Sequence, residues 1–369
     1  MTGPVAWRAP LLALGAVALL AGLVGALGLL GIVPAMGRTA DAHGLVMPLG
    51  FLGTLISLER AVALRAPVAF TVPLAAGVGA LALLTGLPRV VGAFLLTAAG
   101  VGLVLVYLAI GRRQPALYVA VQAGGAVCWY LAGLVVLHER PVADAVPLLG
   151  AFLVITITGE RLELSRVGLP PRPAQLLFAT TTAAVVAGAA LLAVVAPYAA
   201  GRAFGVGLLA VAVWLLRYDV ARRTLRIPGL PRFVAGGLLA GYAWLALAGL
   251  AWVFFGVPPG GFWDAALHAL FLGFVMGMVF AHAPVILPAV LRVSLPYRPV
   301  LVVPVLLLHV SLALRVVGDV AGAGTAWRIG GILNVAAVLL FIATAALVAL
   351  SPAPVRAASP TAPRPGVRA

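Results

Sequence analysis

Four histidines lie within long apolar stretches of this sequence: His43, His268, His282 and His309. An ionisable side chain in such a stretch is costly to bury, so it needs a partner or a purpose. Imidazole nitrogens bind haem iron and copper, so cofactor or metal binding is the chemistry that this set indicates first. The alternative for each residue is a structural role, in which the ring only makes hydrogen bonds inside a helical bundle.

Two of these histidines share the stretch from Asp264 to Pro288. At about 100° per residue, Asp264, His268 and His282 fall on one face of a helix. Gly273 and Gly277 fall on the opposite face as a small-xxx-small pair, which favours close packing of a neighbouring helix. Because about 21 Å of helix separates His268 from His282, one small metal ion cannot bind both.

His43 and His268 each stand near the start of an apolar stretch that enters the membrane from the outer side, so they lie at similar depth in the bilayer. Two imidazoles at one depth on different helices can ligate a haem iron from both sides. Asp264, four residues before His268, can orient that imidazole as a carboxylate behind a metal ligand does. We therefore predict His43 and His268 as cofactor-binding residues, with haem as the first candidate and copper as the alternative.

A second metal site would have to use His282 or His309. His282 needs a separate partner, and Glu59 or Glu160 are the candidates. His309 has a structural alternative, since Ser311 and Asn334 can join it in a polar packing cluster. The fifth histidine, His138, stands beside Glu139 and Arg140 and is expected in a solvated loop.

The elements that must position these residues are membrane-spanning helices. Of the 369 residues, 64% are hydrophobic and 9% are charged, and the mean hydropathy is +1.18. Such a chain is an all-α, polytopic membrane protein whose main partner is the lipid bilayer. The net charge of +15 does not indicate nucleic acid, because the arginines are spread over short loops. A single cysteine, Cys128, excludes an internal disulfide.

Apolar runs of about 20 residues predict twelve spans in a single domain over residues 1–350. The spans are 9–34, 42–64, 67–88, 90–111, 115–137, 144–165, 174–197, 202–217, 233–256, 263–290, 299–318 and 328–350. The tail, 351–369, is rich in Pro, Ala and Arg and is expected to be disordered and cytoplasmic.

The distribution of arginine predicts the orientation. With an N-terminus inside the cell, all but six of the 24 basic residues fall on the cytoplasmic side or in the cytoplasmic tail. The six on the outer side are Arg38, Arg89, Arg140, Arg202, Arg315 and Arg328. This asymmetry predicts a plasma-membrane protein with both termini in the cytoplasm.

Three spans echo one another. Leu49-Gly50-Phe51 in span two matches Leu272-Gly273-Phe274 in span ten, and Glu59-Arg60 matches Glu160-Arg161 in span six. Because these echoes recur every four spans, we predict three pseudo-repeated arcs of four helices, at about 42–137, 144–256 and 263–350.

Two sets of charged residues have competing interpretations. Glu59-Arg60 and Glu160-Arg161 are either carboxylates of a proton path or ion pairs that clamp helix ends. Arg315 and Asp319 are four residues apart, and this spacing predicts an ion pair within one helix.

The segments HGLVMPLGFLGTLISLERAVAL and HALFLGFVMGMVFAHAPVILP resemble NnrS-type membrane proteins. More distantly, twelve helices in three arcs with histidines on helices two and ten resemble the catalytic subunit of haem–copper oxidases. The NnrS resemblance implies haem and copper binding and a link to the nitric oxide response. The oxidase pattern implies that His43 and His268 correspond to low-spin haem ligands. Spans six and seven hold no histidine, so the copper centre that oxidases build there is not expected.

Three functions remain open at this stage. The chain is a haem- or metal-binding NnrS-like protein, a small-solute or ion transporter whose proline-containing span ten lines the path, or a structural subunit with membrane protein partners. The sequence leaves open whether it is an enzyme.

Overall fold

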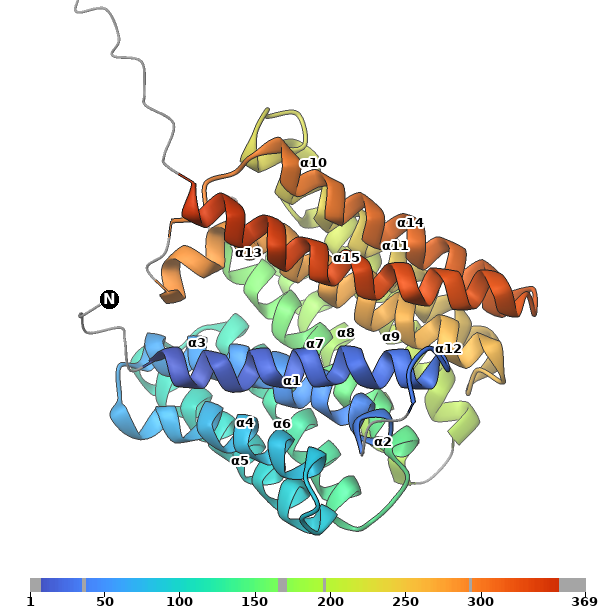
Figure 1. The fold of residues 1–369 in the computed structure, drawn as a ribbon. Helices are drawn as coiled ribbons and strands as arrows, with labels where there is room; N and C mark the ends of the chain where they lie inside the picture. Colours follow the sequence, from blue (N-terminus) through green and yellow to red (C-terminus); the bar gives the residue numbers. More distant parts are fainter. Residues whose placement is uncertain (1–7, 35–37, 165–170, 195–196, 292–293, 352–369) are drawn as a thin grey trace, which may run out of the picture.

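The computed structural model describes residues 8–34, 38–164, 171–194, 197–291 and 294–351 as a bundle of helices with no strand among them. Figure 1 shows the bundle from the side. The elements are α1 (Ala9–Leu29), α2 (Thr39–Leu45), η2 (Val46–Gly53), α3 (Thr54–Leu64), η3 (Pro67–Phe70), α4 (Thr71–Leu84), α5 (Arg89–Arg113), α6 (Leu117–Leu137), α7 (Val142–Leu164), α8 (Arg172–Val194), α9 (Pro197–Tyr218), α10 (Ala221–Thr224), α11 (Leu230–Phe255), α12 (Gly261–His268), η5 (Ala269–Met276), α13 (Gly277–Leu291), η6 (Pro299–Leu301), α14 (Val302–Val320) and α15 (Gly324–Leu350).

The all-α membrane architecture is confirmed. Each predicted span coincides with a long helical segment, and in the described part 11 of these are long and apolar enough to cross a bilayer. The predicted span outside these 11 is 174–197, which corresponds to α8, a helix of 23 residues between α7 and α9. The eighth span is longer than predicted, since α9 begins at Pro197 and carries Arg202 inside the helix. The predicted disordered tail, from 352 onward, lies outside the described residues.

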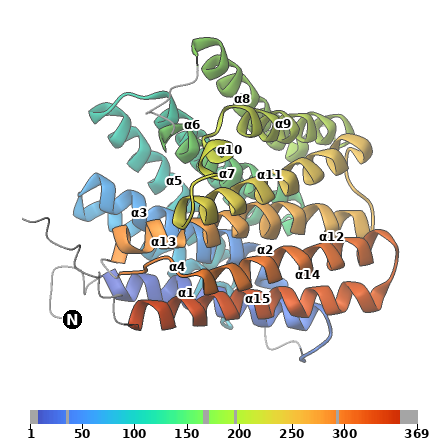
Figure 2. The same cartoon turned by 90° about the horizontal axis from the view of Figure 1, so that it is seen from above.

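Consecutive helices run antiparallel and pack side by side, as in α5 with α6 and α14 with α15. The start of α1 and the end of α15 lie at the same end of the bundle (Figure 1), as an even number of crossings requires. We call this the terminus end and the opposite one the far end. Seen from above, α7 and the α12–α13 segment lie between the α8–α9 pair and α15 (Figure 2).

Spans two, six and ten form the interior. In their most apolar windows, 67%, 78% and 61% of the residues are buried, against 39–56% in the other candidate spans of the described part. Contacts also recur every four spans: α1 packs on α4, α6 on α8, and α11 on α14. Both observations agree with three four-helix arcs. The superposition of those arcs stays a prediction.

Two π-helical segments stand at matching places. Aligning Leu49-Gly50-Phe51 with Leu272-Gly273-Phe274 places η2 (Val46–Gly53) on η5 (Ala269–Met276), residue for residue. A π-helical turn closes i→i+5 hydrogen bonds and is frequent at functional sites. The phase of 100° per residue does not hold across such a segment. The prediction that His268 and His282 share one face therefore rested on a geometry that span ten does not have.

The predicted small-residue face of span ten is a packing surface. A Cβ added at Gly273 would collide with Trp244 of α11, and one at Gly277 would lie 3.1 Å from His309 Cε1 on α14. The two glycines thus allow two different helices to approach the middle of the bundle.

Candidate functional site

The first polar site lies at the far end, around the Asp264 carboxylate in the first turn of α12. Arg315 of α14 donates two hydrogen bonds to it, from Nε to Oδ2 at 2.9 Å and from Nη2 to Oδ1 at 3.0 Å. Trp327 of α15 adds a third, from Nε1 to Oδ2 at 3.1 Å. One carboxylate therefore joins three helices, and the bidentate arginine fixes its orientation.

The same carboxylate orients His268. The ring Nδ1 lies 3.1 Å from Asp264 Oδ1 and 2.9 Å from the Asp264 backbone oxygen. Both oxygens are acceptors, so Nδ1 carries the hydrogen and donates it. The prediction that Asp264 orients His268 is confirmed. The other ring nitrogen, Nε2, has no hydrogen-bond partner among the described residues.

His43 on α2 has the same arrangement. Its Nδ1 lies 2.7 Å from the backbone oxygen of Gly22 on α1, which fixes Nδ1–H as the donor. Within the described chain no group bonds to its Nε2 either. His43 on α2 and His268 on α12 come from segments at the same end of the bundle (Figure 1). That the two rings share one site stays a prediction. Both imidazoles are only half-buried.

The donor set of this site is two imidazoles. Among the described residues, no group of three or more His, Cys, Asp or Glu side chains could hold a metal ion. Two clefts of the described part, of about 470 and 280 Å³, are lined by other residues. Among the described residues the predicted site therefore offers a metal two imidazole nitrogens, and a haem would also need room for its ring.

One far-end prediction is wrong. The i,i+4 spacing predicted that Arg315 pairs with Asp319, but the arginine forms its bidentate pair with Asp264. The reason is geometric, since two parallel bonds need the planar guanidinium to face a carboxylate squarely. That carboxylate comes from a helix 51 residues away in the chain.

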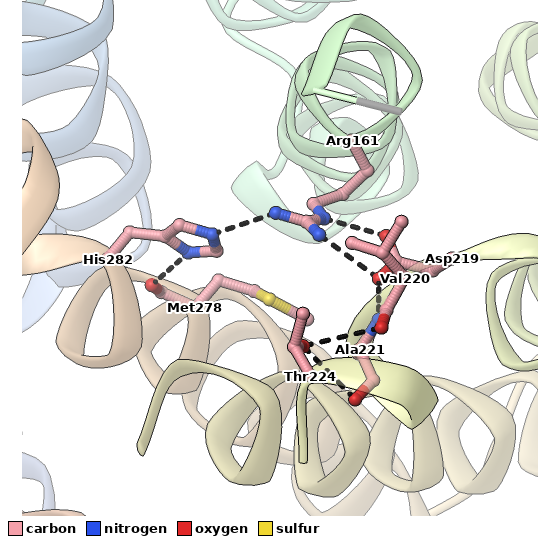
Figure 3. Close-up of polar contacts among 7 residues, drawn as sticks. All are labelled: Arg161, Asp219, Val220, Ala221, Thr224, Met278 and His282. Atoms are coloured by element: carbon pink, nitrogen blue, oxygen red, sulfur yellow. Dashed lines mark hydrogen bonds and ion pairs between the residues drawn. The ribbon is translucent and has the colours of Figure 1, made fainter. Parts of the chain in front are cut away.

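A second polar site lies at the terminus end, around Arg161 of α7 (Figure 3). Its guanidinium donates to Asp219, from Nε to Oδ2 at 2.8 Å and from Nη2 to Oδ1 at 3.0 Å. The side chains of Arg161 and Asp219 are 6% and 0% exposed. Asp219 also accepts a 2.7 Å bond from the backbone N–H of Ala221, which starts α10. The ion pair therefore ties α7 to the turn after α9.

His282 completes this second site. Arg161 Nη1 lies 3.1 Å from His282 Nε2, and His282 Nδ1 lies 2.9 Å from the Met278 backbone oxygen (Figure 3). An arginine only donates, so Nε2 is the acceptor and Nδ1 the donor. The expectation of a glutamate partner is not what the structure shows, because the neighbour of Glu160 in sequence, Arg161, takes that place. With both nitrogens bonded, His282 is a poorer metal ligand than His43 or His268.

A third polar group adjoins the second on α7. Arg60 of α3 forms ion pairs with Glu59 beside it, with Glu160 at 3.6 Å and with Glu163 at 4.0 Å. The predicted clamp between the ends of spans two and six is thus present. Because Glu160 and Arg161 are adjacent in sequence, the two polar groups meet at the end of α7.

The last predicted metal ligand, His309, accepts a hydrogen bond at its Nδ1 from Trp244 Nε1 at 3.1 Å. The hydrogen of a neutral ring then sits on Nε2, which leaves no lone pair for a metal. The predicted cluster with Ser311 and Asn334 is half right. Asn334 lies 2.7 Å from Ser311 Oγ, while His309 faces α11 instead.

The comparison with protein families decides the membership of this chain. A family model described as Domain of unknown function (DUF8744) matches residues 8–350. The chain belongs to the DUF8744 family. The match covers every described helix, so both polar sites lie within the family's domain. A search among curated proteins finds no match.

Sequence reasoning missed Asp219, Arg315 and Trp327 as members of these sites. Asp219 did carry a signal, since it is the only acid among the arginines from Arg217 to Arg232. An acid that ends an apolar span in such a segment is a natural partner for a buried cation. Its actual partner, 58 residues away, could not be read from spacing.

Proposed function

We propose that this protein is an NnrS-like integral membrane protein in which His43 and His268 together hold a metal cofactor, either a haem iron or a copper ion. One observation carries the proposal. In both imidazoles Nδ1 carries the hydrogen and donates it to an oxygen, so Nε2 has the free lone pair. Neither Nε2 has a hydrogen-bond partner in the part of the chain that the structure describes. Metal-ligating histidines have this arrangement, in which a second group fixes the tautomer and the ring.

Three features support the proposal. Arg315 and Trp327 hold the Asp264 carboxylate, so the His268 ring is oriented in the absence of a metal. The two histidines stand on segments at the same end of the bundle (Figure 1). Both follow the positions of the low-spin haem ligands in the oxidase resemblance. His43 and His268 would hold the iron of a haem, or a copper ion, through their Nε2 atoms, and the metal would supply redox chemistry there.

The test is the optical spectrum and metal content of the protein purified from cells supplied with haem precursor and copper. A Soret band indicates haem, and stoichiometric copper without that band indicates the ion. We expect His43→Ala and His268→Ala each to remove the signal. His138→Ala is the matched control, because that ring is exposed and bonds only to the Leu134 backbone oxygen. A wild type with neither signal overturns the proposal.

The second candidate is a proton- or ion-coupled transporter, and the terminus end favours it. Glu59, Glu160 and Glu163 form ion pairs with Arg60, and Glu160 is adjacent in sequence to Arg161, which bonds to His282. Chains of acids and histidines within spans mark proton paths in transporters. Proton flux into dye-loaded proteoliposomes tests this candidate. We expect Glu160→Gln to abolish the flux, whereas Glu139→Gln in an exposed turn leaves it unchanged. Absence of flux in the wild type removes the candidate.

A further inference from the structure

A cleft of about 470 Å³ opens at the terminus end, and none of its lining residues belongs to the polar sites described above. Its lining residues are Arg8, Val62, Arg65, Pro67 and Phe70, which come from the start of α1, the end of α3 and the η3 turn. The cleft therefore lies where three segments meet at the end of membrane-spanning helices, which is the level of the lipid headgroups.

The local backbone holds Arg65 at the rim of this cleft. Arg65 caps α3 in the left-handed conformation, with φ of 56°, and its N–H donates to the Ala61 oxygen. This cap ends the helix and turns the chain, so that Pro67 can begin η3 in the opposite direction. The Arg65 side chain is exposed and makes no hydrogen bond or ion pair to a described residue. Its guanidinium thus has its donors available at the rim.

The cleft has a positive charge and no compensating acid in its lining. Arg8, the residue that caps the start of α1, contributes a second guanidinium from the facing segment. The N-terminus of a 21-residue helix adds the positive end of its dipole beside Arg8. Two arginines on different elements around one cleft suit a phosphate group, because a guanidinium donates paired hydrogen bonds to its oxygens.

The rest of the cleft is apolar. Val62 and Phe70 pack against the buried pair Leu11 and Leu58, and Phe70 also contacts the main core. Next to the cleft, Val68 is 74% exposed. An apolar lining does not stabilise the binding of a soluble anion. A phospholipid can place its phosphate on the arginines and its hydrocarbon chain against the valine and phenylalanine.

From this geometry we infer that the cleft binds an anionic phospholipid, with the phosphodiester between Arg8 and Arg65 and an acyl chain along Val62 and Phe70. Basic pockets between membrane helices bind anionic headgroups in this way. The second cleft, of about 280 Å³, holds only one arginine, Arg328, whose guanidinium donates to the Gly31 backbone oxygen. It supplies a matched control at the far end.

Native mass spectrometry of the full chain tests the site, with phosphatidylglycerol and phosphatidylcholine added separately. We expect the wild type to retain phosphatidylglycerol in preference to phosphatidylcholine. Arg65→Gln, on the exposed side chain, should weaken the phosphatidylglycerol complex roughly fivefold, the worth of about 1 kcal/mol for one arginine near a lipid surface. Arg8→Gln should act in the same direction, and Arg328→Gln should leave the complex unchanged.

Two results would overturn the inference. One is equal retention of phosphatidylglycerol by the wild type and the Arg8→Gln/Arg65→Gln double variant, provided that both unfold at the same temperature in phosphatidylcholine. The other is protection of the wild type against thermal unfolding by inorganic phosphate to the same extent as by phosphatidylglycerol, since this would make the cleft a site for a free anion. The metal assays of His43 and His268 do not bear on either result.

Discussion

Arg161 and Asp219 form a bidentate ion pair with N–O distances of 2.8 and 3.0 Å, although 58 residues separate them in the chain. The pair is buried at the terminus end, where it joins α7 to the turn before α10. A charge in such a place requires partners, and Arg161 bonds to both oxygens of the Asp219 carboxylate and to the ring of His282. The pair thus anchors the most buried span of the described part to its neighbours.

Removing one partner of this pair should destabilise the protein severely. Asp219→Asn leaves the Arg161 guanidinium buried without a counter-charge, which costs about 3–5 kcal/mol of unfolding free energy. Thermal unfolding in detergent measures the effect. Arg161→Met/Asp219→Leu should be more stable than Asp219→Asn, because it buries no unpaired charge. A double variant less stable than the single one contradicts this account.

The metal site should depend on Asp264 although that residue is not a ligand. Asp264→Asn weakens the acceptor that fixes His268, and loss of such a group lowers metal affinity about 10–100-fold. A metal titration followed by absorbance measures the change. The control is Asp144→Asn, since Asp144 pairs with Arg140 at 2.8 Å in an exposed i,i+4 arrangement without a histidine. Equal affinities in wild type and Asp264→Asn would exclude a supporting role for the carboxylate.

The π-helical segment of span two should tolerate no added methyl group at Gly53. A Cβ there would lie 2.6 Å from the Trp129 ring, which is itself fully buried. We expect Gly53→Ala to lower the unfolding free energy by about 1–3 kcal/mol through overpacking. At Gly236, in the helical part of α11, a Cβ meets nothing within 4 Å, so Gly236→Ala should raise stability by about 0.5–1 kcal/mol. Similar effects at the two sites would show that packing does not distinguish them.

The predicted topology assigns each loop to one side of the membrane. Reporter fusions after Arg65, Arg113, Arg172 and Arg232 should all report the cytoplasm, because the arginine-rich loops stay inside. Fusions after Arg38 and Arg140 should report the outside. A single reversal among the six would require an added or a missing crossing. The structure shows only that the start of α1 and the end of α15 lie at the same end of the bundle.

The sequence by itself determined the class of protein and the position of its spans. Hydrocarbon thickness sets the length of an apolar run, and each run of about 20 residues became a helical segment. It also determined contacts within one helix, such as the orientation of His268 by Asp264, because i,i+4 neighbours meet in any helix. The predicted alignment of span two with span ten coincides with η2 and η5, although their π-helical geometry was not predicted.

Only the tertiary structure decided the partners of the buried charges. Arg315 had an i,i+4 candidate in Asp319, yet it pairs with Asp264, and His282 meets Arg161 where a glutamate was expected. A buried charge selects the partner that offers the best two-bond geometry, and helix packing brings that partner from 51 to 121 residues away. Local spacing holds no information on such distances. The pairing of His43 with His268 was itself predicted from the sequence, whereas the hydrogen bond of His43 to the Gly22 backbone oxygen on α1 came only from the tertiary structure.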